Sequence, residues 1–146
     1  MSNKEQLTLE DLNPFSDKDV YIQYYDKSIN RVKGFIKKGL STYILTENED
    51  LMLDIIDCKL ILRPLSDLTK PITHNGETFV PIEWLEEKYP AFNYREQCER
   101  IMEDSRWINQ CEYLLVQQLL EWKFDIGGFI LKRLAISTNS ITEKVY

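Results

Sequence analysis

Hydrophobic positions in the first half of the chain come in short runs that alternate with polar ones, as β-strands require. Residues 20–27 and 31–38 are rich in Val, Ile, Tyr and Phe, and residues 28–30 favour a turn, so this segment predicts a β-hairpin. Gly34, inside the second run, predicts a bulge or bend. Further strands are expected within residues 40–47, 51–57 and 59–65, separated by Gly39 and by a turn at residues 48–50.

The second half changes to the periodicity of helices. Pro81 suits a first helical position, and Pro90 ends the short helix that follows it. Asn93 and Glu96 have the spacing of a helix start at which the two side chains satisfy exposed backbone donors. Apart from Gln118, apolar residues then recur at steps of three and four from Trp107 to Trp122, which predicts one continuous helix through residues 107–122. We expect this helix to end at the pair Gly127 and Gly128, and residues 129–136 to form a short helix or a strand.

Three remaining segments complete the predicted organisation. Residues 7–15 indicate a single helical turn or an extended lead-in that stops at Asn13 and Pro14. The seam between the halves contains Asn75 and Gly76, which tolerate positive φ and predict a tight hairpin turn. Residues 137–146 are polar and suggest a loose tail.

Together these patterns predict an α+β fold in one domain over residues 1–146. A small antiparallel curled sheet or barrel, over about residues 15–70, is expected to pack with a helical half over about residues 80–135. A chain of 146 residues with 43% hydrophobic content is long enough for one substantial core.

From its composition, we expect the chain to stay in the cytosol of the cell that makes it. No apolar run is long enough to span a membrane, and the N-terminus lacks the basic start and apolar stretch of a secretory signal. Three widely spaced cysteines, Cys58, Cys98 and Cys111, fit reduced, buried thiols better than a disulfide framework.

Charge is uneven along the chain. The formal net charge is −6, and the acidic excess is concentrated between residues 77 and 112. A net acidic protein is a poor candidate for wrapping nucleic acid, because affinity for phosphate comes mainly from Lys and Arg. The net negative charge instead favours a partner with a basic surface.

No catalytic, cofactor-binding or metal-binding pattern is found in the sequence. His74 is the single histidine, sits beside the Asn75–Gly76 turn and is expected to be solvated. The glycines are not spaced as in a phosphate-binding loop, and no cysteine pair has the spacing of a zinc site. Acidic residues instead form a ridge on the helix after Asn93, where side chains three or four apart share a face. This ridge consists of Glu96, Glu99, Glu103 and Asp104.

Several segments carry a resemblance to a family. The stretches "ILRPLSDLTKPI", "HNGETFVPIEWLE", "LLEWKFD" and "LAIS" resemble a recurring set in small uncharacterised accessory proteins of phages and prophages of Bacteroidota. The resemblance covers about residues 59–137 and implies a phage or prophage accessory protein, without any reaction or catalytic residue. Lys123 stands where the family pattern has His, and residues 126–137 also depart from the usual sequence, so no role that rests on that histidine is expected here.

The leading hypothesis is a non-enzymatic inhibitor of a bacterial defence system, acting in the host cytoplasm. RNA-guided nucleases hold their guide and target in channels rich in Lys and Arg, and an acidic ridge would suit such a surface. The most specific form of the hypothesis is therefore an inhibitor of a CRISPR nuclease or of its guide-bound complex, an anti-CRISPR protein, with no cofactor.

Two alternatives come from other functional classes. A virion structural or assembly protein would associate through exposed aromatic residues, with Trp84, Tyr89, Phe92 and Tyr94 as the candidates. A small nucleic-acid-binding protein would use basic residues of the first hairpin beside stacking aromatic rings. The basic candidates are Lys27, Arg31, Lys33, Lys37 and Lys38, and the aromatic ones are Tyr21, Tyr24, Tyr25, Phe35 and Tyr43.

Overall fold

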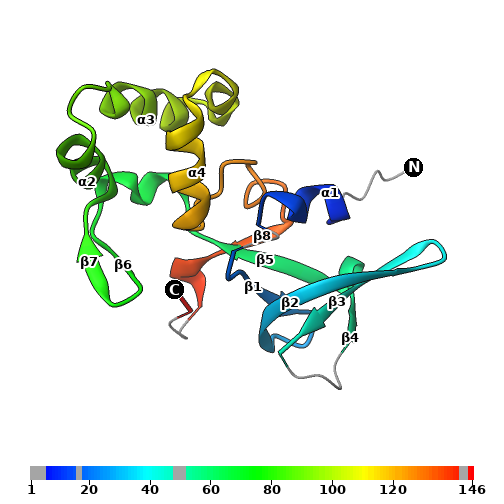
Figure 1. Ribbon diagram of the computed structural model, residues 1–146. Helices are drawn as coiled ribbons and strands as arrows, with labels where there is room; N and C mark the ends of the chain where they lie inside the picture. Colours follow the sequence, from blue (N-terminus) through cyan, green and yellow to red (C-terminus); the bar gives the residue numbers. More distant parts are fainter. Residues whose placement is uncertain (1–5, 16–17, 48–51, 142–144) are drawn as a thin grey trace. The chain divides into compact units, whose positions relative to one another are not determined.

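The protein has an α+β fold that divides into two compact units (Figure 1). The computed structural model describes residues 6–15, 18–47, 52–141 and 145–146. Unit 1 comprises Met1–Leu62 and Phe129–Ser140, and unit 2 comprises Arg63–Gly128 and Ile141–Tyr146. The single domain expected over residues 1–146 stays a prediction. The turn expected at residues 48–50 and part of the expected polar tail, residues 142–144, lie outside the described residues.

Unit 1 is built on a six-stranded sheet in the order β4-β3-β2-β1-β5-β8. Every neighbouring pair is antiparallel except β5 and β8, which run parallel, so the sheet is mixed where the sequence predicted an antiparallel one. The sheet is open and does not close into a barrel. Its strands are β1 (Tyr21–Tyr24), β2 (Ile29–Lys38), β3 (Ser41–Thr46), β4 (Met52–Asp54), β5 (Cys58–Leu62) and β8 (Ala135–Ser137).

Local sequence accounts for the details of this sheet. A register shift between Val32 and Gly34 in the pairing of β2 with β3 confirms the predicted bulge. Residues 7–15 form the predicted helical turn, α1 (Leu9–Leu12), followed by the 3₁₀ helix η1 (Asn13–Phe15). The Thr8 side chain accepts a hydrogen bond from the Asp11 N–H while Asp11 accepts one from the Thr8 N–H, which satisfies two otherwise open donors at the start of α1. The described part of unit 1 also contains the 3₁₀ helices η2 (Ile55–Asp57) and η5 (Thr138–Ser140).

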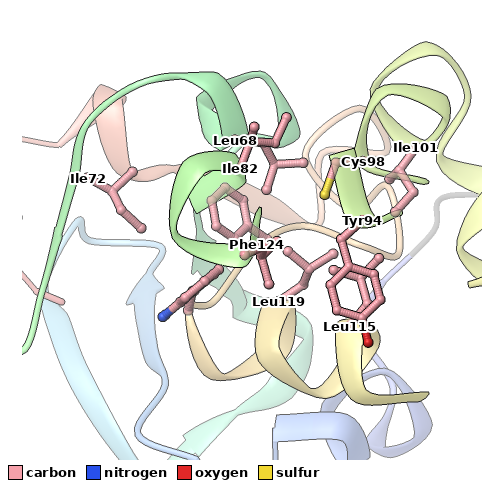
Figure 2. Packing of buried hydrophobic residues seen from close by; sticks show 11 residues of the cluster. Leu68, Ile72, Ile82, Tyr94, Cys98, Ile101, Leu115, Leu119 and Phe124 are labelled. Carbon is pink, nitrogen blue, oxygen red and sulfur yellow. The ribbon is translucent and has the colours of Figure 1, made fainter. Parts of the chain in front are cut away.

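Unit 2 contains a small hairpin and three α-helices. Strands β6 (Ile72–His74) and β7 (Glu77–Phe79) pair antiparallel across Asn75 and Gly76, whose φ values of 51° and 84° confirm the predicted turn. The helices are α2 (Pro81–Lys88), α3 (Tyr94–Glu103) and α4 (Tyr113–Glu121), and the 3₁₀ helices are η3 (Leu65–Thr69) and η4 (Ser105–Gln110). Their apolar faces meet in one buried cluster, which Figure 2 shows with Tyr94, Leu115 and Phe124 among its members.

The predicted continuous helix over residues 107–122 is wrong. A 3₁₀ helix, η4, occupies the first part, and Cys111 and Glu112 are extended, with ψ of 155° and 147°, before α4 begins. The side chain of Asp104 accepts a hydrogen bond from the Arg106 N–H and so starts η4 as a separate element. Trp107, which the helical stripe placed in the core, is 42% exposed as a consequence.

Helix α4 also ends earlier than the glycine pair predicted. Lys123 adopts φ of 63°, its N–H donates to the Leu120 carbonyl, and the Phe124 N–H donates to the Leu119 carbonyl. These two bonds form a Schellman motif, in which a left-handed residue terminates a helix. Glycine usually takes that position, and here a buried lysine does. Residues 129–134 then form turns that lead into β8, so the strand alternative for this segment is confirmed at its end.

Candidate functional site

Half of the predicted acidic ridge is neutralised by neighbouring arginines. Glu96 forms an ion pair with Arg100 at 2.8 Å, one helical turn further along α3. Asp104 lies at the end of α3 and is paired with Arg106 at 2.7 Å; these hydrogen bonds lower the pKa of the Asp104 carboxyl to about 2. Neither carboxylate therefore presents an uncompensated negative charge to a partner.

The other half of the ridge keeps its charge and is joined by residues that the sequence analysis left out. Glu99 and Glu103 are exposed, lie four residues apart on α3 and form no ion pair within the described residues. The pKa of the Arg95 guanidinium is raised by its hydrogen bond to Glu86 and also by Glu99 and Glu83, so acids of α2 and α3 gather around Arg95.

We define the acidic surface of unit 2 as its exposed carboxylates without an ion pair in the described part of the chain, on α2 and α3: Glu83, Glu87, Glu99 and Glu103. Glu83 and Glu87 are four apart on α2, as Glu99 and Glu103 are on α3. That spacing was visible in the sequence, but the approach of α2 to α3 was not. Because arginines pair with Glu96 and Asp104, the unpaired negative charge of the acidic surface lies on Glu99 and Glu103 of α3 and on Glu83 and Glu87 of α2.

The aromatic residues proposed for assembly are mostly packed together. Tyr94 is buried and donates a hydrogen bond from its hydroxyl to Glu112 at 3.1 Å. Its ring stacks on Phe92 with centroids 5.3 Å apart and meets Tyr89 edge-on, while Tyr89 meets Trp84 in the same way. Phe92, at 43% exposure, is the one exposed residue among these four, so the expectation that all four are exposed is wrong.

The predicted basic hairpin does not form one surface. Arg31 is held between Asp19 and Glu47 in two ion pairs, which neutralise it. Lys33, Lys37 and Lys38 are exposed along β2, and Lys37 and Lys38 lie at its far end, beside the turn into β3. Lys27 lies at the opposite end of the hairpin, in the turn after β1, close to Tyr24 and Tyr25. Because β2 is ten residues long, about 30 Å separates these two ends.

His74 is buried, so the expectation of a solvated turn residue is wrong. Its relative exposure is 9%, and neither imidazole nitrogen has a hydrogen-bond partner within the described residues. Two buried cations, Lys123 and Arg63, lie nearby, and burial together with these charges lowers the pKa of His74. The imidazole is therefore neutral near pH 7.

The two buried cations of this cluster are held by backbone carbonyls. Nε of Arg63 donates to the carbonyl of Trp122 and its Nη2 to that of Thr73, both at 2.8 Å. Lys123 Nζ donates to the carbonyl of Glu121 at 2.8 Å, and the Tyr146 ring lies 5.4 Å from this nitrogen. The contacts of Arg63 tie the end of α4 to the β6–β7 hairpin, and those of Lys123 give this residue a structural role.

The three cysteines are free thiols, as predicted. Cys58 and Cys98 are buried, and burial raises the pKa of each to about 12, which keeps both protonated and unreactive. Across the described residues, no three His, Cys, Asp or Glu side chains are placed to hold a metal ion. The described helices are all too short or too polar to span a bilayer.

Comparisons with protein-family models, with curated proteins and with solved structures found no match to this chain.

Proposed function

We propose that the chain is a non-enzymatic binding protein, encoded by a phage or prophage, that inhibits an RNA-guided CRISPR nuclease in the cytoplasm of its bacterial host. The observation that carries the proposal is the acidic surface of unit 2. The resemblance of residues 59–137 to phage accessory proteins supplies the biological setting.

Charge is divided between the units in a way that supports this proposal. Acidic and basic residues are nearly balanced in unit 1, and unit 2 holds most of the acidic excess. The four carboxylates of the acidic surface need no internal bond to break before they meet an external cation. A channel lined with Lys and Arg attracts such a surface and is occupied by it in competition with the phosphate backbone of a guide or target strand.

Charge reversal on the acidic surface tests the proposal. In a cleavage assay with a CRISPR nuclease from a Bacteroidota host, Glu99→Lys together with Glu103→Lys is expected to weaken inhibition by at least about tenfold, because like charges across an interface cost several kcal/mol. Higher salt is expected to weaken inhibition by the wild-type protein, since exposed charges are screened.

A matched control separates this effect from a change in net charge. Glu10→Lys together with Glu77→Lys alters the net charge by the same amount at exposed sites on α1 and β7. This control is expected to inhibit like the wild-type protein. If the wild-type protein inhibits and the variants at Glu99 and Glu103 inhibit equally well while folded, the acidic-surface mechanism is refuted.

Assembly into a virion is a second candidate, favoured by a different observation in unit 2. Trp107, Tyr113 and Leu114 are exposed to 42%, 74% and 52% around the junction of η4 and α4. Large exposed apolar side chains this close together are typical of protein contacts. Light scattering of the purified protein discriminates the two candidates: a discrete multimer that dissociates on Leu114→Lys favours assembly, and a monomer favours the inhibitor.

A further inference from the structure

Three strand ends of unit 1 meet at one end of its sheet and bring together residues that are far apart in the sequence. Tyr24 at the end of β1 pairs with Cys58 at the start of β5, because these strands run antiparallel. Strand β8 runs parallel to β5, so its start lies there too: the Leu60 N–H donates to the carbonyl of Leu134 at 3.1 Å. Figure 1 shows β1, β5 and β8 as neighbours in this order.

Each of these three strand ends contributes a basic residue to one pocket of about 590 Å³. Lys27 follows β1, Lys59 lies in β5, and Lys132 and Arg133 precede β8. The pocket has the size of ordinary small-ligand sites, which range from about 300 to 1,000 Å³. One acidic residue, Asp57, is among the residues that line it.

The four cations of the pocket differ from four arginines elsewhere in the chain in their partners. None of the four forms an ion pair within the described residues, whereas Arg31, Arg95, Arg100 and Arg106 are each paired with carboxylates. Placing four like charges around one pocket raises its positive potential, and an anion relieves this repulsion. The pocket is therefore suited to a negatively charged ligand.

Closed turns fix the backbone at two of these four residues. Lys27 and Arg133 have φ of 73° and 63°, in the left-handed region that non-glycine residues seldom adopt. The Lys27 N–H donates to the Tyr24 carbonyl at 2.8 Å, and the Arg133 N–H donates to the Ile130 carbonyl at 3.0 Å. Both residues thus lie in hydrogen-bonded turns at the end of the sheet, so their backbone needs little ordering when a ligand binds.

Two tyrosines give the pocket an aromatic side. The rings of Tyr24 and Tyr25 have centroids 4.6 Å apart and are tilted by 59°, and Tyr25 is 74% exposed. Such a ring is available to stack on a flat ligand, and stacking of a nucleobase on an aromatic side chain contributes about 1–3 kcal/mol. Inorganic phosphate alone would leave this ring unused, whereas a nucleotide uses the ring and the cations together.

We infer that this pocket of unit 1 binds one nucleotide unit, with its phosphate held by Lys59, Lys132 and Arg133 and its base stacked on Tyr25. The unit belongs either to a free nucleotide or to a single-stranded nucleic acid, which share this chemistry. A duplex is excluded as the ligand of the stacking ring, because its bases are already stacked on one another. The inference is independent of the acidic surface of unit 2.

Binding is to be measured with the full chain and two probes: UMP, and a fluorescent single-stranded oligouridylate of about ten nucleotides, a length within the usual site sizes of such proteins. Tight binding of both probes assigns the site to a free nucleotide. Binding of the oligonucleotide alone assigns it to single-stranded nucleic acid, for which affinity falls with salt as phosphate contacts are screened.

Matched variants decide whether the pocket is responsible. Lys59→Gln with Lys132→Gln is expected to weaken binding at least about tenfold, since each phosphate contact contributes substantially to affinity. Lys37→Gln with Lys38→Gln removes two exposed lysines at the far end of β2 in the same unit, and it is expected to change binding less than about twofold. Tyr25→Leu is expected to weaken binding at least about fivefold and Tyr25→Phe to preserve it.

The inference is overturned if neither probe binds, or if the Lys37 and Lys38 variant weakens binding as much as the Lys59 and Lys132 variant, which would indicate a diffuse charge effect. Equal binding by Tyr25→Leu and the wild-type protein would overturn the stacking of the base. Circular dichroism of each variant checks that the fold is intact. Loss of binding in an unfolded variant is resolved by the single change Arg133→Asn, because asparagine tolerates the left-handed conformation of this position.

Discussion

Trp122 offers a sharp test of how unit 2 is stabilised. The side chain is 3% exposed at the end of α4 and belongs to the buried cluster of Figure 2. Its ring lies 4.9 Å from that of Trp84 in an edge-on arrangement and 5.1 Å from that of Phe79, measured between centroids. Replacement by alanine removes the largest type of side chain from this cluster and leaves a cavity behind it.

The expected loss is about 4 kcal/mol in the free energy of unfolding. Buried Trp→Ala replacements cost about 3–5 kcal/mol through lost transfer energy and the cavity. The two close ring contacts favour the upper half of this range, because aromatic pairs contribute about 0.5–1.5 kcal/mol each beyond their buried area. Denaturant titration followed by tryptophan fluorescence is the suitable assay, since all three tryptophans lie in unit 2 and two remain in the variant.

Trp107→Ala is the matched control, because the sequence pattern placed both tryptophans on one helical stripe. Trp107 is 42% exposed, and the guanidinium carbon of Arg100 lies 5.3 Å from its ring centroid. An exposed contact of this kind contributes about 0.5–1 kcal/mol. A loss below about 1 kcal/mol for Trp122→Ala would refute the cluster as described. Equal losses for both variants would instead support the continuous helix that the sequence pattern predicted.

Three further predictions concern burial and backbone conformation. The pKa of buried His74 is lowered in the folded protein, so as the pH falls the imidazole is protonated in the unfolded chain before it is protonated in the folded one. Unit 2 is therefore expected to lose stability as the pH falls below about 6.5. His74→Phe is expected to reduce the loss in denaturation midpoint between about pH 7 and about pH 5, and an unchanged loss would contradict the prediction. A thiol reagent is expected to modify half-buried Cys111 before Cys98, because burial raises the pKa of the Cys98 thiol to about 12. Equal rates of modification, measured by mass spectrometry, would contradict this. Gly76→Ala is expected to destabilise by about 1–2 kcal/mol because its φ is 84°, whereas Gly34→Ala, whose new Cβ would lie 4.0 Å from Leu45, is expected to change stability by less than about 0.5 kcal/mol in the same titration.

Features that depend on a few neighbouring residues could be predicted from the sequence. The hairpin of β1 and β2, the bulge at Gly34 and the turn at Asn75 and Gly76 all follow from backbone preferences. The start of α3 after Asn93 was also predicted, although Asn93 donates from its side chain to the Glu96 carboxylate and does not cap the backbone. Local rules thus located the element correctly even where the hydrogen bond they assumed is absent from the described residues.

Features that depend on competition between local and distant contacts could not be predicted from the sequence. The apolar stripe from Trp107 to Trp122 satisfies helical periodicity, yet Asp104 begins a 3₁₀ helix and the extended residues Cys111 and Glu112 divide the stripe. Leu115 and Leu119 of the stripe are fully buried, while Leu114 is about half exposed. Periodicity reports which residues would share a helical face, and it does not report whether the chain stays helical between them.

Charged sites were also difficult to predict from the sequence, for a different reason. Their chemistry depends on which charges are already paired within the chain. Arg31 and Glu96 were predicted as candidates from their residue type and spacing, but both form ion pairs with neighbouring residues of the same chain. Lys59 and Lys132 were not among the predicted candidates, because both approach Lys27 only through strand pairing. Lys59 does so through the antiparallel pairing of β1 with β5, and Lys132 through the parallel pairing of β5 with β8, a strand more than seventy residues further along. An ion pair at the surface contributes little to stability, but it removes a charge from the set that a ligand can meet. Unpaired charges brought together by topology are therefore the better guide to binding, and both proposals made for this chain rest on them: the acidic surface of α2 and α3, and the basic pocket at the ends of β1, β5 and β8.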